Sequence, residues 1–177
     1  TISNSVEIKT LSVDVGIGSI DLQNIGADNA KITGTIEINL DGFHRETLDL
    51  DGTLEDINAA DISVIKELSL HLYGSTAVVS GDIKGDVLIE SAGISNTDIT
   101  FVNSDRSDYS IKSTWEPEAE NKEPGILLFK RGKVGISIDG ENYDMKYTDS
   151  NLEAPYKLTI TSRKLMPMNN ITIRFID

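Results

Sequence analysis

Few residues in this chain belong to the types that usually catalyse reactions. His44 and His71 are the two histidines, and there is no cysteine. Neither histidine has a second histidine at metal-ligand spacing, and neither belongs to a recognisable Ser-His-Asp arrangement. Without cysteine, the chain has no disulfide, thiol nucleophile or thiolate metal site. The sequence therefore predicts a non-enzymatic protein, and the alternative is a pair of carboxylates, brought together by folding, that hydrolyses glycosides.

Acidic residues beside turn glycines are the candidates for metal chemistry. Carboxylate oxygens, completed by the backbone carbonyls of turns, are ligands that suit Ca²⁺. An EF-hand is excluded, because with Gly52 at the sixth position of the loop an asparagine takes the place of the bidentate acid at the twelfth. We name Asp49, Asp51, Asp82 and Asp86 as candidate calcium ligands. The alternative is that these side chains are solvated turn residues and that the protein uses no cofactor.

Two aromatic residues are candidates for ligand binding. Trp115, the only tryptophan, lies in the segment 103–124, which also contains two of the four prolines. An indole ring in such a segment can stack on a sugar or anchor a protein interface, and it can equally fold back to cap the end of a sheet. Tyr109 lies in the same segment. The sequence thus leaves a carbohydrate-binding or protein-binding module as the alternative function.

The charge is unevenly distributed. Residues 1–100 contain 5 Lys and Arg against 17 Asp and Glu, whereas residues 101–177 contain 11 against 12, so the first part carries nearly all of the formal net charge of −13. Such a surface repels nucleic acid and anionic lipid. Its role is then to keep the protein soluble, to bind divalent cations or to dock onto a basic protein partner.

The first residues of the chain are polar, and its apolar runs are short. No stretch reaches the roughly 20 apolar residues that span a bilayer, so we expect no membrane insertion. The start of the chain lacks the basic flank and apolar core of a signal peptide. We therefore expect cytoplasmic synthesis or a virion component, with the host compartment left open.

Alternating apolar and polar residues predict the elements that position these side chains. Runs such as 36–40, 68–72, 157–161 and 171–175 place every second side chain on one face, which is the period of a half-buried strand. Apolar residues three apart favour one short helix over 62–67, capped by Asp61. Turn residues predict antiparallel hairpins around 139–142 and 167–170.

Two segments carry a resemblance to a known family. Residues 11–22 contain Val13-Asp14-Val15-Gly16-Ile17-Gly18-Ser19-Ile20-Asp21-Leu22, and residues 80–91 read Ser80-Gly81-Asp82-Ile83-Lys84-Gly85-Asp86-Val87-Leu88-Ile89-Glu90-Ser91. Both resemble the repeated Gly-Asp-apolar-x-apolar rungs of adhesin-type β-solenoids. The resemblance covers at most about 100 residues and is interrupted over 43–67, so it implies a fold for the first part of the chain and no site residue or function.

These patterns predict an all-β protein. The two architectures that fit are an antiparallel β-sandwich, or a short β-solenoid-like N-terminal layer followed by antiparallel hairpins. We divide the chain into an acidic β-rich region 1–102, a loop or linker 103–124 and a hairpin region 125–177, which together can form one domain. The expected function is that of a structural or assembly protein, such as a subunit of a virion, appendage or adhesive surface structure, that forms homo-oligomers through protein–protein contacts.

Overall fold

The computed structural model describes residues 2–35, 37–93, 95–116, 135–144, 147–149, 151, 153–163 and 170–176. Within these residues the protein is almost entirely β-structure, and its strands form one 12-stranded sheet. The strands are β1 (Ile2–Asp14), β2 (Ser19–Gly34), β3 (Glu37–Thr53), β4 (Asp56–Tyr73), β5 (Thr76–Ile83), β6 (Asp86–Ala92), β7 (Asn96–Val102), β8 (Tyr109–Glu116), β9 (Gly135–Ile138), β10 (Glu141–Asp144), β11 (Tyr156–Arg163) and β12 (Asn170–Ile176). The prediction of an all-β protein is confirmed.

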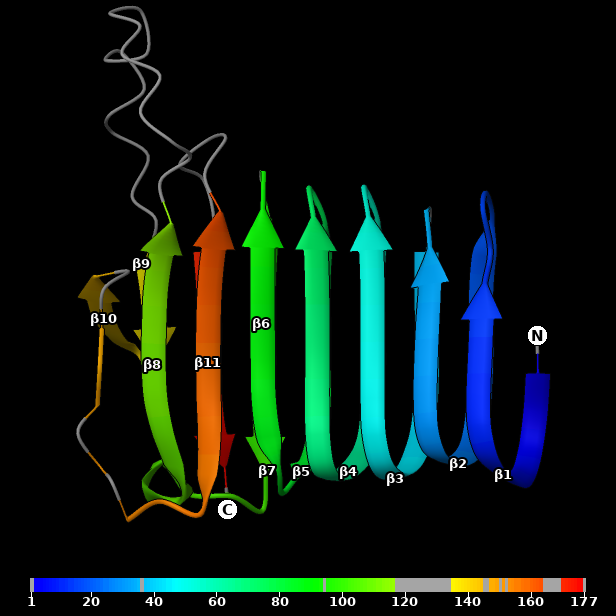
Figure 1. Ribbon diagram of the computed structural model, residues 1–177, viewed down its shortest axis with the longest axis horizontal. Helices are drawn as coiled ribbons and strands as arrows, with labels where there is room; N and C mark the ends of the chain where they lie inside the picture. The colour runs from blue at the N-terminus through cyan, green and yellow to red at the C-terminus, as the bar shows by residue number, and fades with distance from the viewer. Residues whose placement is uncertain are drawn as a thin grey trace, which may run out of the picture.

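The sheet winds into a solenoid of two layers (Figure 1). The first halves of β1 to β4 continue through β5, β7, β12 and β9 in one layer, and their second halves continue through β6, β11 and β8 in the other. Neighbouring coils pair in parallel, and Ala30 is in register with Leu48 and Leu48 with Leu68. From β1 to β7, a residue is therefore stacked on the one that lies 18 to 20 positions later in the chain, which confirms the solenoid-like alternative.

The core lies between the two layers. Because side chains alternate along a strand, one side of each layer faces inward and the other faces solvent. A single inward row crosses five strands of one layer in register, and every member of it is completely buried: Ile32, Leu50, Leu70, Ile89 and Ile160. The apolar periodicity of the sequence is the direct cause of this row.

The predicted helix over 62–67 is wrong, because these residues belong to strand β4. Ile62 is buried, whereas Ile65, three residues later, is 56 % exposed, so the two side chains do not share a face. Asp61 has a left-handed backbone with φ of 50°. Asp is one of the few residues that tolerate this conformation, and here it lies at an irregularity in the pairing of β4 with β5, between Ala59 and Ile62.

The predicted antiparallel arrangement is only partly right. The strands β9 and β10 form the expected antiparallel hairpin around Asp139-Gly140. In contrast, β11 and β12 are not a hairpin, because they lie in different layers and each pairs in parallel with its neighbours. The sheet is mostly parallel, so the sandwich is not confirmed. The alternation of apolar and polar residues cannot distinguish an antiparallel sandwich from a solenoid, because in both architectures one face of each layer is exposed to water.

Part of the predicted loop 103–124 is regular structure. Residues Arg106–Asp108 form a short 3₁₀ helix, η1, and β8 follows it directly. Ile111 and Ser113 are buried in β8 because its residues alternate as in the other strands. Residues 117–124 lie outside the described part of the chain. Strands from the regions 1–102 and 125–177 belong to the same sheet.

Truncating a core leucine tests the importance of the inward rows. We expect Leu50→Ala to lower the free energy of unfolding by about 2–5 kcal/mol, because it opens a cavity at a completely buried site. The matched control is Leu54→Ala, at a leucine that is 76 % exposed, and it should change stability by less than about 1 kcal/mol. Urea denaturation followed by circular dichroism measures both, and equal losses would contradict the assignment of the core.

Candidate functional site

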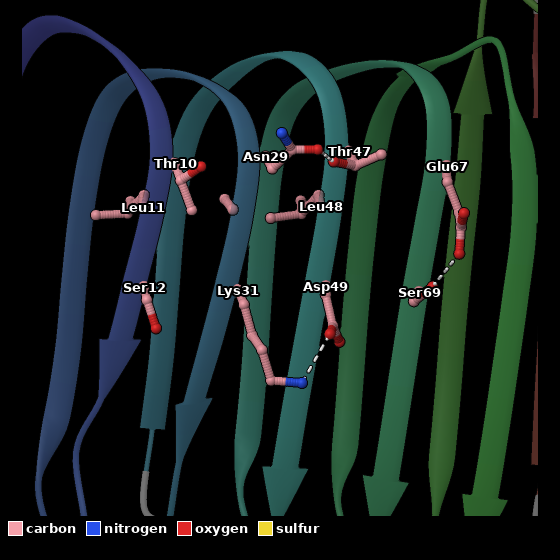
Figure 2. Close-up of a pocket in the computed structure, with 11 residues that line it drawn as sticks. Thr10, Leu11, Ser12, Asn29, Lys31, Thr47, Leu48, Asp49, Glu67 and Ser69 are labelled. Carbon is pink, nitrogen blue, oxygen red and sulfur yellow. Dashed lines mark hydrogen bonds and ion pairs between the residues drawn. The ribbon is translucent and has the colours of Figure 1, made fainter.

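The solvent face of the layer that contains the second halves of β1 to β4 carries rows of polar side chains. Ser12, Lys31, Asp49 and Ser69 are in register across four strands. The neighbouring row is Thr10, Asn29, Thr47 and Glu67. Figure 2 shows that side chains of both rows line a common hollow. Because the coils stack in register, residues far apart in sequence become neighbours at the spacing of adjacent strands, about 4.8 Å.

The hollow has a volume of about 390 Å³ and is lined by residues of β1 to β4. Lys31, Asp49 and Glu67 are its charged residues, and Leu11, which is partly exposed, contributes apolar surface. A second hollow of about 180 Å³ lies over the first halves of β2 to β4. There the Asn39 side-chain amide donates to Asp21, and the Asn58 amide donates to Asn39. Both hollows are open depressions of the surface and not enclosed cavities.

Lys31 and Asp49 form an ion pair across the first hollow. The Lys31 Nζ lies 2.8 Å from Asp49 Oδ2 (Figure 2). This hydrogen bond is the main reason why the pKa of Lys31 is raised above its ordinary value. Because the lysine is more than half exposed, water screens the pair, and such pairs contribute about 0–1 kcal/mol to stability. The ion pair therefore aligns the two side chains more than it stabilises the fold.

His71 lies between two carboxylates on the same face. Its Nδ1 is 2.9 Å from Glu90 Oε2, and its Nε2 is 3.5 Å from Asp49 Oδ1. Asp51 is in register with His71 on the adjacent strand. Sequence analysis assigned no role to His71, because Glu90 lies 19 positions after it and Asp49 lies 22 positions before it. Only the coil length of the solenoid could have revealed them.

The candidate calcium ligands do not come together as one group. Asp49, which pairs with Lys31, and Asp51 both lie on β3, whereas Asp82 lies at the end of β5 and Asp86 at the start of β6. Asp82 forms an ion pair with Lys84, and Asp86 accepts the backbone N–H of Lys157. In the described part of the chain, no group of three or more acidic or histidine side chains is arranged to hold a metal ion. Calcium binding stays a prediction.

The candidate ligand-binding aromatics lie on β8. The ring of Tyr109 is completely buried and contacts the rings of Phe101 and Phe175, with centroids 4.9 and 5.5 Å away. Its hydroxyl donates to the carbonyl of Ile83. In this structure Tyr109 therefore packs the core and offers no surface to a ligand. Trp115 is paired in register with Ser162 of β11, and its side chain lies outside the described part of the structure.

The polar face remains strongly acidic after ion pairing. Four of the five basic residues in 1–100 form ion pairs with acids in the described structure: Lys31, Arg45, Lys66 and Lys84. Since these pairs use only a few of the 17 acids, the surplus negative charge is carried by the surface. The surface of these coils as a whole thus offers hydrogen-bond acceptors to a partner that carries donors or positive charge.

Comparisons with known proteins found no match for this chain, whether among protein-family models, curated proteins or solved structures. The resemblance to adhesin-type β-solenoids stays an expectation. The segments that carry it do cross solenoid corners, one between β1 and β2 and the other between β5 and β6. None of the described residues forms a helix that is long and apolar enough to cross a membrane.

Removing the Tyr109 hydroxyl tests its role in the core. Burial raises the pKa of Tyr109 well above its ordinary value. Above about pH 10 the unfolded chain loses this proton while the folded chain keeps it, so stability falls as the pH rises. We expect Tyr109→Phe to cost about 0.5–1.5 kcal/mol near pH 7, because the Ile83 carbonyl loses one donor and keeps the hydroxyl of Ser104 as the other. The variant should also lose less stability than the parent between pH 9 and pH 11.

Urea denaturation at several pH values measures both effects. The matched control is Tyr73→Phe, at a tyrosine that is 55 % exposed, and it should leave both the stability at pH 7 and its pH dependence unchanged. A Tyr109→Phe variant with the parent's stability and the parent's pH dependence would contradict the assignment.

Proposed function

We propose that this chain is a non-enzymatic assembly subunit whose copies associate through the open end of the solenoid at β1. The observation that supports the proposal is the position of β1 at the edge of the sheet, where it pairs with β2 alone. The backbone N–H and C=O groups along its other side have no partner strand in the described structure. Such an edge is a template for a further strand.

The core is also open at β1. Leu11 and Val13 face inward but are only partly buried, whereas Ala30 and Ile32, in register with them on β2, are 3 % and 0 % exposed. The difference arises because β2 is covered on both sides and β1 on one. A strand from another molecule placed beside β1 would complete the burial of these side chains, which is the dominant favourable contribution to most protein association.

The sequence of β1 suits pairing with a second copy of itself. In an antiparallel pair centred on Ser12, Leu11 lies opposite Val13 of the other copy and Thr10 lies opposite Asp14. Residues directly opposite each other in such a pair point to the same face, so Leu11 meets Val13, Lys9 lies opposite Val15 at each end of the pair, and no two acids are opposed. The resulting interface has two-fold symmetry, which is the commonest form of association between identical chains.

Charge favours this end over the rest of the solenoid surface. Lys9 and Asp14 are the charged residues of segment 9–15, so the segment has no net charge, although residues 1–100 together have a net charge of −12. Two copies that met through other parts of the acidic coils would repel each other. Contact through β1 keeps the acidic faces beside one another and exposed. Assemblies of this kind fit the virion, appendage or surface structures expected from the sequence.

Placing a charge at the open end tests the proposal. We expect the parent protein to self-associate, and we expect Leu11→Lys to raise the dissociation constant of the dimer at least tenfold, because the two-fold pair would bury two ammonium groups. Sedimentation velocity over a range of concentrations measures the association. Leu54→Lys is the matched control, since Leu54 is 76 % exposed and lies between β3 and β4. A parent protein that stays monomeric at high concentration would overturn the proposal.

A further inference from the structure

Two strands lie between strands that precede them in the sequence. β11 pairs in parallel with β6 on one side and with β8 on the other, and β12 lies in the same way between β7 and β9 (Figure 1). In the described structure, β6 does not pair with β8 and β7 does not pair with β9. Residues 156–163 and 170–176 therefore fill one strand position in each layer. We call this two-layer position the strand slot.

The strand slot makes contacts along both backbones and into the core. β11 is in register with β6 over Leu158–Arg163 and with β8 over Tyr156–Arg163. Four inward apolar side chains of the two inserted strands are at most 1 % exposed: Leu158, Ile160, Ile171 and Ile173. Phe175 stacks on Phe101, with ring centroids 4.7 Å apart. The slot thus recognises a strand pair by a double backbone ladder and by apolar side chains at fixed positions.

The chain reaches the slot by passing around β8. Thr148 pairs with Lys112 on one side of β8, and β11 begins at Tyr156 on the other side of the same strand. In the described part of this connection, the side-chain amide of Asn151 donates to the carbonyl of Ser107 at 3.0 Å. The connection from Thr148 to Tyr156 covers eight residue steps, and a chain of that length spans at most about 26 Å.

We infer that the strand slot accepts residues 156–176 of a second copy of this chain, so that two copies exchange β11 and β12. This inference rests on the proposed function as an assembly subunit and names a second mode of contact between the copies. Every backbone and side-chain contact inside the slot is the same whichever copy supplies the strands, so exchange changes only the connection between Thr148 and Tyr156. Exchange at the slot together with pairing at β1 would join copies at both ends of the solenoid.

Cysteine pairing between two copies tests the exchange. The Thr114 and Thr161 hydroxyl oxygens, on β8 and β11, lie 3.4 Å apart, and the chain has no cysteine of its own. Full-length Thr114→Cys and Thr161→Cys chains that carry different tags are mixed, held in a urea concentration below the unfolding midpoint, returned to buffer and oxidised. We expect a disulfide-linked heterodimer on non-reducing gels, at a yield at least tenfold above that of a mixture of Thr114→Cys with Thr33→Cys.

The double variant Thr114→Cys/Thr161→Cys is the control for geometry. In a single copy the two cysteines should form an intrachain disulfide, and a chain locked in this way should no longer exchange strands with an unlocked one. If the double variant locks but the mixed single variants give no more heterodimer than the Thr33→Cys mixture, the inference is overturned.

The two proposals fail separately. If the parent protein self-associates but no mixed disulfide forms, contact through β1 is supported and strand exchange is overturned. If the parent protein does not associate through β1 but the mixed disulfide forms undiminished in Leu11→Lys chains, strand exchange is supported and contact through β1 is overturned.

Discussion

The parallel register between successive coils is the constraint on which the whole structure depends. Leu48 stacks on Ala30 and Leu68 stacks on Leu48, so each coil presents its apolar side chains to the same interior and its polar side chains to the same solvent face. A shift of one residue in any coil would turn its apolar row outward. The repeat of 18 to 20 residues therefore fixes the core and both surfaces at once.

Solenoid geometry also explains where a partner can be recognised. Along the faces, the register lines up residues such as Lys31 with Asp49 and His71 with Glu90, and the result is an ordered polar surface with surplus negative charge. Among the described strands, β1 is an edge strand with backbone groups and partly covered apolar side chains on its outer side, whereas β9 and β10 form an antiparallel hairpin at the other edge of their layer.

The interleaving of β11 and β12 distinguishes this protein from a simple stack of coils. A chain that added coils one after another would place each strand beside its predecessor, as β2 and β3 do. Here β8 and β9 take positions one strand further on, and later residues fill the places between. Contacts such as those of Leu158 and Ile173 therefore depend on segments that are distant in sequence. In the proposed exchange a second copy supplies β11 and β12 through the same contacts, and only the connection between the strands changes.

The sequence by itself determined the all-β character, because alternation along runs such as 36–40 and 171–175 decides which side chains can be buried in a strand. It also determined the acidic first half and the hairpin around Asp139-Gly140. Only the tertiary structure decided that the strands run in parallel coils, that Asp61 marks an irregularity in strand pairing and not a helix cap, and that Tyr109 is core. The physical reason is that alternation specifies a buried face but not the partner strand, and partners such as His71 and Glu90 meet only through coil stacking.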